Sequence, residues 1–111
     1  MKINTQNYND VAVVELQGDF TAEFEKQFED NVSAVISEGA KGIVLDMSKI
    51  GFIDSQSLEQ ILWLRDYCNE NSCQLKIAAL DENCSKILYI TRLENQLDTY
   101  EELSRAVKSF A

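Results

Sequence analysis

Hydrophobic residues along the chain form either short continuous runs or longer runs with helical spacing. Residues 11–16, 43–47 and 75–80 are nearly continuous apolar runs, which are typical of strands covered on both faces. Residues 2–8 are more polar, and turn-forming residues at 7–10 follow them. The pattern therefore predicts a hairpin whose first strand lies at or near an edge, with Gly18 ending its second strand.

The segments between and after these strands have the periodicity of amphipathic helices. The first is expected to begin with Thr21 as its cap and to end at Gly39 in a left-handed conformation. A second helix follows residues 52–57, and Asn83 is expected to cap a short third one. The apolar positions expected to face the sheet are Phe24, Phe28, Val32, Val35 and Ile36 in the first helix and Ile87, Leu88 and Leu93 in the third.

The chain ends with a brief edge strand at residues 97–100 and a last helix at 101–110, so the element order is β-β-α-β-α-β-α-β-α. Strands that alternate with helices indicate a mainly parallel sheet, because parallel neighbours need crossover connections. At 111 residues, without a linker or repeat, residues 1–111 are expected to form a single domain. The predicted fold class is α/β, with a mixed, mostly parallel sheet of four to five strands packed against about four helices.

The net charge and the hydropathy of the chain limit the classes of partner that it can bind. Ten basic and nineteen acidic residues give a net charge of −9, which repels nucleic acid and anionic lipid headgroups. The apolar runs are far shorter than the roughly 20 residues of a membrane span, and no apolar leader is present. We therefore expect a cytoplasmic protein that binds no nucleic acid and does not insert directly into a membrane.

The residue types needed for catalysis or metal binding are scarce. The chain has no histidine, and Cys68, Cys73 and Cys84 show no C-x-x-C spacing. Glycine-rich phosphate loops and nucleophile constellations are also missing. The sequence predicts three buried or idle thiols, no metal, no cofactor and no enzymatic activity.

The segment "FIDSQSLEQILWL" at residues 52–64 changes from an apolar pair to a polar turn and then to a helix. Asp54 or Ser55 is expected to be the helix cap. The same turn has a second interpretation, because free N–H groups and the positive end of the helix dipole would stabilise a phosphorylated hydroxyl there. Capping and signalling are compatible, because one residue can cap while its neighbour is modified.

The helix that follows has one broad apolar face and two aromatic residues elsewhere. At about 100° per residue, Trp63 and Tyr67 fall on the polar side together with Gln60. These aromatic side chains either form part of a protein-binding surface or are covered by another element of the same domain. The residues expected on the buried face are Leu58, Ile61, Leu62, Leu64 and Cys68.

Three segments in this order resemble the STAS domain of anti-sigma-factor antagonists, which is also found in sulfate transporters and bacterial lipid-transport complexes. They are "VAVVELQGDF", "GIVLDMSKIGFIDSQSL" and "ILYITRLENQLDTYEELSRAV", and together they span nearly the whole chain. The second is similar to the strand, connection and Asp-Ser-Ser/Thr-Gly-Leu turn of the family. The resemblance implies a partner-switching module that binds an anti-sigma factor or serine kinase and releases it when the turn is phosphorylated.

The chain departs from this family pattern at the acceptor. Gln56 occupies the acceptor position, Ser57 stands in place of the glycine, and Thr21 lies near a common aspartate. Either Ser55 or Ser57 is a displaced phosphoacceptor, or the domain is locked in an unphosphorylated-like state. The residues that we expect to bind the partner are Asp19, Thr21, Asp54, Ser55, Gln56, Ser57, Gln60, Trp63 and Tyr67.

Two further possibilities about partners remain open from the sequence. As an alternative to the anti-sigma factor or kinase, the resemblance allows a STAS subunit of a membrane transport complex, with a lipid-transport ATPase as its partner. The polar first strand at residues 2–8 could also pair with another copy of the chain to give a homodimer.

Overall fold

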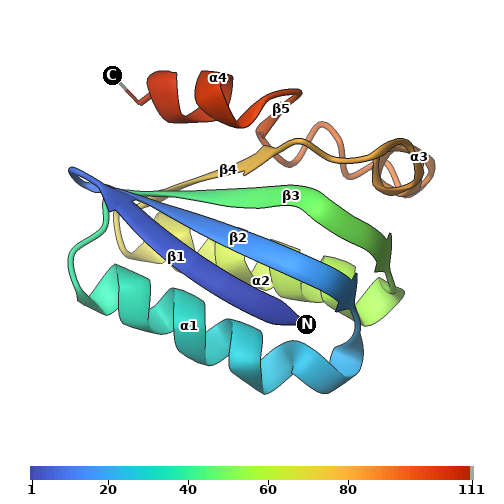
Figure 1. Ribbon diagram of the computed structural model, residues 1–111, viewed down its shortest axis with the longest axis horizontal. Coiled ribbons are helices and arrows are strands. Elements are labelled where there is room, and N and C mark those ends of the chain that lie inside the picture. Colours follow the sequence, from blue (N-terminus) through green and yellow to red (C-terminus); the bar gives the residue numbers. More distant parts are fainter. Residues whose placement is uncertain (111) are drawn as a thin grey trace.

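Five strands form a single sheet in the computed structural model, which describes residues 1–110 (Figure 1). The strand order is β1-β2-β3-β4-β5; β1 and β2 are antiparallel, and every other neighbouring pair is parallel. The predicted mixed and mainly parallel sheet is confirmed. The strands are β1 (Lys2–Tyr8), β2 (Val11–Phe20), β3 (Gly42–Ile53), β4 (Gln74–Ala78) and β5 (Thr99–Tyr100).

Helices cover both sides of this sheet, as the predicted element order requires. A 3-10 turn, η1 (Ala22–Phe24), leads into α1, and α1 and α2 lie together on one side of the sheet (Figure 1). On the other side, α4 covers β3, β4 and β5, and α3 packs beside β3. The α-helices are α1 (Glu25–Ser37), α2 (Ser55–Glu70), α3 (Glu82–Ile90) and α4 (Leu103–Lys108).

The continuous apolar runs reflect burial on both faces of the central strands. Val14 of β2 belongs to the large core between the sheet and helices α1 and α2. Its neighbour Val13 belongs to a smaller core between the sheet and α4. Successive side chains of a strand point to opposite faces, so a strand between two helical layers needs apolar residues at consecutive positions. The smaller core is formed by Val13, Val44, Ala78 and Ala106.

Gly18 does not end β2, which corrects the prediction. The strand continues to Phe20, and its pairing with β3 shifts register twice, between Glu15 and Gln17 and between Gly18 and Asp19. Gly18 has a φ of +109°, a conformation that is easy for glycine and strained for other residues. The third strand is longer than its apolar run at 43–47 indicated, because β3 runs to Ile53 and stays paired with β2 over that length.

The helix ends agree only in part with the predicted caps. Gly39 closes α1 with a φ of +100°, as expected. Thr21 precedes η1 but makes no hydrogen bond through its side chain. Asp81, not Asn83, caps α3, because its carboxylate accepts a hydrogen bond of 2.8 Å from the N–H of Cys84. Leu93 packs against the core from beyond the end of this helix.

The three thiols are free and buried, which confirms that prediction. Burial is also the main reason that the pKa of the Cys84 thiol is raised to about 12. Within residues 1–110, no helix is long and apolar enough to span a bilayer, and no three metal-ligating side chains of the His, Cys, Asp or Glu type gather at one place.

Candidate functional site

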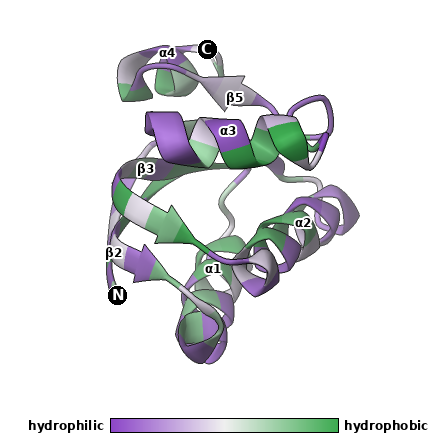
Figure 2. Ribbon diagram, turned by 90° about the vertical axis from the view of Figure 1, so that its right-hand side faces the viewer, coloured by the Kyte–Doolittle hydropathy of each residue, from purple (hydrophilic) through white to green (hydrophobic). Residues whose placement is uncertain are grey.

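The 54–57 turn, formed by Asp54, Ser55, Gln56 and Ser57, joins the end of β3 to the start of α2. Figure 2 views this end of the molecule, where β2 and β3 finish and α1 and α2 begin. Ile53 is buried and anchors the turn from the strand side, while Leu58 is buried and anchors it from the helix side. The turn is therefore fixed by the core at both ends.

The carboxylate of Asp54 joins two parts of the backbone. Its Oδ1 accepts a hydrogen bond of 2.8 Å from the N–H of Ser57, and its Oδ2 accepts one of 3.1 Å from the N–H of Ala22. Asp54 is thus the cap of α2, which settles the choice between Asp54 and Ser55. The bond from the Ser57 N–H is the main reason that the pKa of this carboxyl lies below its usual value.

Ser57 lies inside this network and is fully buried. Its hydroxyl hydrogen-bonds the carbonyl of Phe20 and lies 2.8 Å from Oδ1 of Asp54. The N–H of Asp54 also donates to the Phe20 carbonyl, at 3.3 Å. These bonds connect the end of β2 to the start of α2. The Ser57 hydroxyl is therefore inaccessible to a kinase unless the turn opens.

Ser55 and Gln56 differ from their neighbours because both side chains are exposed. In the described part of the chain, neither side chain forms a hydrogen bond. They belong to the first turn of α2, where helix N–H groups also point outward. Asp19 is exposed near the tip of β2, and Thr21 is half-buried where η1 begins. The fold therefore brings Asp19 and Thr21 to the same end as the 54–57 turn.

Phe52 is a residue of this end that sequence reasoning missed. It pairs with Asp19 across β2 and β3, and 51% of its surface is exposed. Ile53 is buried beside it, so the two residues point to opposite faces of the strand. Period-two alternation would have revealed this, but it applies only where the segment is known to be a strand.

Gln60, Trp63 and Tyr67 do not lie on a free polar face of α2. The amide nitrogen of Gln60 donates a 2.9 Å hydrogen bond to Glu25 at the start of α1. The rings of Trp63 and Tyr67 contact each other with centroids 5.2 Å apart, and both side chains are half-buried against the core. Other parts of the domain therefore partly cover these two aromatic side chains, which was one of the two possibilities that the sequence left open.

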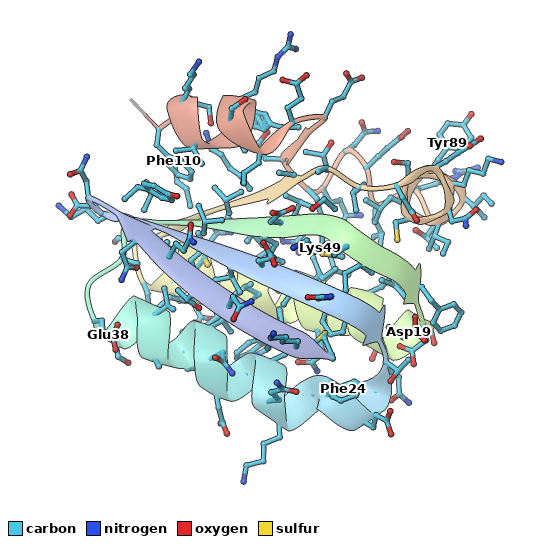
Figure 3. The ribbon with its side chains drawn as sticks, in the orientation of Figure 1. Asp19, Phe24, Glu38, Lys49, Tyr89 and Phe110 are labelled. Carbon is cyan, nitrogen blue, oxygen red and sulfur yellow. The ribbon has the colours of Figure 1, made fainter. Side chains whose placement is uncertain are left out.

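The electrostatic character of this end is acidic. Exposed carboxylates lie near the 54–57 turn on two chain segments, the one from the end of β2 to the start of α1 and the first turns of α2. They are Asp19, Glu23, Glu25 and Glu59. Figure 3 shows Asp19 at this end, near the tip of β2, and Phe24 on the α1 side of the same end. A surface with one exposed aromatic ring, two uncharged polar side chains and an acidic rim is suited to binding a protein with basic groups.

Known protein structures share this architecture at low sequence identity. An anti-sigma factor antagonist from Mycobacterium paratuberculosis has a TM-score of 0.87 and 18% identity, with 97% of this chain and 92% of that chain covered. The Bacillus cell fate determinant SpoIIAA in its phosphorylated form has a TM-score of 0.76 and 14% identity, with 99% and 100% covered. A sulfate transporter family protein from Wolinella succinogenes has a TM-score of 0.81 and 16% identity, with 92% and 85% covered.

Identities this low establish the fold alone, whereas the match to a family model is specific to the sequence. The STAS domain model matches residues 2–106, which include every strand and helix up to the middle of α4. The chain therefore belongs to the STAS domain family.

Proposed function

We propose that this STAS domain is a non-catalytic regulatory module that binds an anti-sigma factor or a related serine kinase through Phe52 and the 54–57 turn. One observation carries the proposal: Asp54 and Ser57 fix the backbone of the turn, while Ser55, Gln56 and Phe52 remain exposed. A surface fixed before binding loses little conformational entropy when a partner docks. The fold and family of the chain support a binding role of this kind.

The state of the turn follows from which hydroxyls a kinase can reach. Gln56 occupies the position that the family resemblance assigns to the phosphoacceptor, and glutamine has no hydroxyl. Ser57 has a hydroxyl, but it is buried and hydrogen-bonded to the carbonyl of Phe20. Ser55 alone in the turn offers an exposed hydroxyl. In the proposed function the domain holds the binding-competent state by default, and Ser55 is the residue through which phosphorylation would weaken binding.

The chemistry of the partner surface follows from the charges and exposure at this end. The carboxylates of Asp19, Glu23 and Glu59 favour arginine or lysine around the rim of the contact. Phe52 projects from the end of β3 and would fill an apolar recess, as aromatic anchors of interfaces commonly do. A dianionic phosphoryl group on Ser55 would lie at the uncharged centre of the contact, and not at its acidic rim. Burying these charges against the apolar recess that receives Phe52 carries a desolvation cost, which would oppose docking.

A second function is supported by the fold shared with the Wolinella sulfate transporter family protein. In that case the chain would be a stable, non-catalytic subunit of a membrane transport complex with an ATPase partner. Its contact surface would then centre on the partly buried Trp63 and Tyr67 pair of α2, and not on Gln56. The two functions thus predict different contact residues.

Site-specific photo-crosslinking distinguishes them. A photoreactive amino acid is placed at Gln56, at Tyr67 or at Gln74, which is exposed at the start of β4, near the C-terminal end of α2. We expect the Gln56 probe to trap one protein in the native cells and the Gln74 probe to trap none above background. The trapped protein must then bind the purified chain. Trapping of an ATPase by the Tyr67 probe, with none by the Gln56 probe, would favour the transport function.

A further inference from the structure

The outer edge of the sheet is formed by β1, whose seven residues pair with β2 in one unbroken register. Alternate main-chain N–H and C=O groups of a strand point to opposite sides, so half of those of β1 face away from β2. Figure 1 shows α1 and α2 on one face of the sheet, with no helix of the described chain wrapped around the β1 edge. The full length of β1 is therefore open to another strand.

The edge lacks the features that commonly prevent strand pairing. The chain has no proline, the β1–β2 ladder has no bulge, and Lys2 is the single charged residue of β1. The side chains of residues 4–8 are exposed on both faces of the sheet, and four of the five belong to uncharged asparagine, threonine or glutamine. Natural edge strands are usually blocked by proline, bulges or several charges.

The charge distribution indicates which partner this edge fits. The whole chain carries −9, yet residues 1–9 contain no acidic residue. On the neighbouring strand, Glu15 lies opposite Asn4 and forms an ion pair of 3.1 Å with Lys49. This edge is thus nearly neutral, and two acidic molecules can approach each other there with little repulsion.

We infer that two copies of the chain associate through antiparallel pairing of β1 with β1, which joins their sheets into one of ten strands. A two-fold axis at Thr5 allows all seven residues to pair and keeps each residue on its own face of the sheet. Thr5 then lies opposite Thr5 of the second copy, and Asn4 lies opposite its Gln6. Lys2 lies opposite the half-exposed ring of the second copy's Tyr8, where an ammonium group is favourable.

Analytical ultracentrifugation of the full chain over a concentration series tests this association. Thr5→Lys places two ammonium groups directly opposite each other at the axis, and we expect it to raise the dimer dissociation constant at least about tenfold. Ser85→Lys changes the net charge equally on an exposed part of α3 and should leave the constant unchanged. A chain that stays monomeric throughout the series, or two variants that respond alike, would overturn the inference.

Cysteine crosslinking tests the register of the two strands. Directly opposite residues of antiparallel strands have Cβ atoms about 5 Å apart, so Thr5→Cys should give a disulfide-linked dimer with oxidised glutathione. In the inferred register the two copies of Asn7 lie roughly 13 Å apart along the strands, so Asn7→Cys should remain unlinked. The unmodified chain is the blank, because its three thiols are buried. Crosslinking of Asn7→Cys in preference to Thr5→Cys would contradict this pairing.

Discussion

Two buried polar clusters lie in opposite parts of this domain, and they stabilise it in different ways. At the 54–57 turn, Ser57 and Asp54 bond mainly to backbone groups of Phe20 and Ala22. Beneath α4, by contrast, Lys76 of β4 is buried among side chains. Its Nζ bonds the hydroxyl of Ser109 and lies 4.3 Å from the ring centroid of Phe110. Figure 3 shows Phe110 at the far end of the molecule from Asp19.

The difference lies in what each cluster leaves accessible. The Lys76 cluster uses its side chains to hold α4 on the sheet, with Asp98 at 3.9 Å and Tyr100 at 5.4 Å completing the surroundings of the ammonium group. The turn uses one buried hydroxyl and one carboxylate to fix the backbone and leaves Ser55 and Gln56 exposed. A fixed backbone with free side chains is what a binding surface needs.

The largest effect is expected at the Lys76 cluster. Lys76→Ala removes a buried alkyl stem together with its cation–π contacts, and we expect a loss of about 3 kcal/mol in the free energy of unfolding, measured by chemical denaturation. Lys76→Met retains the stem, and Asp98 is half-exposed, so no buried charge is left without a partner. We expect this control to cost less than about 1 kcal/mol. Equal losses in both variants would show that the charge itself holds α4.

At the turn, two serines of the same helical turn should behave differently. Ser57→Ala leaves the carbonyl of Phe20 with one hydrogen bond fewer in a buried place, and a loss of about 2 kcal/mol is expected. Ser55→Ala changes an exposed side chain and should stay within about 0.5 kcal/mol of the unmodified chain. Urea denaturation of the two variants measures both values. If they lost the same amount, Ser57 would not be the residue that fixes the turn.

The smallest effect on stability is a dependence on pH through Asp54. Because the pKa of this carboxyl is lowered from 3.8 on folding, its contribution is fully present above pH 3.8. That contribution is lost as the pH falls further, through the pKa of the folded state. The melting temperature of Asp54→Asn should therefore lie below that of the unmodified chain at pH 6, and the gap should narrow below pH 3.8. A gap that is constant with pH would mean that the charge of Asp54 adds nothing.

Much of the fold could be predicted because hydrophobic periodicity decides which residues are buried. The apolar run at 11–16 predicted a central strand, and the period of Phe28, Val32, Val35 and Ile36 predicted the buried face of α1, as the structure confirms. Gly18 was misinterpreted because glycine at a strand irregularity and glycine at a strand end look alike in sequence. The difference depends on pairing with β3, which is a long-range interaction.

The candidate site was predictable to a smaller extent for the same reason. The sequence placed Asp54 at the start of a helix, since capping is local. Whether Ser55 or Ser57 is exposed depends on Phe20, which is 37 residues before Ser57 in the chain. Phe52 was missed because its exposure depends on the length of β3. The sequence left open whether Trp63 is covered, because a helical projection does not show which neighbours pack around a helix.

The affinity of the photo-crosslinked partner for Gln56→Glu tests the central claim most directly, with Gln74→Glu as a control that adds the same charge at the other end of the domain. Gln56 is exposed in the first turn of α2 and its side chain makes no hydrogen bond within the described residues, so the substitution changes charge without disturbing the turn. Because the added carboxylate would be buried at the uncharged centre of the contact, away from the basic groups at its rim, we expect Gln56→Glu to weaken binding about tenfold or more, and Gln74→Glu to leave it unchanged. Equal affinity of both variants and the unmodified chain would show that the partner does not bind at the 54–57 turn.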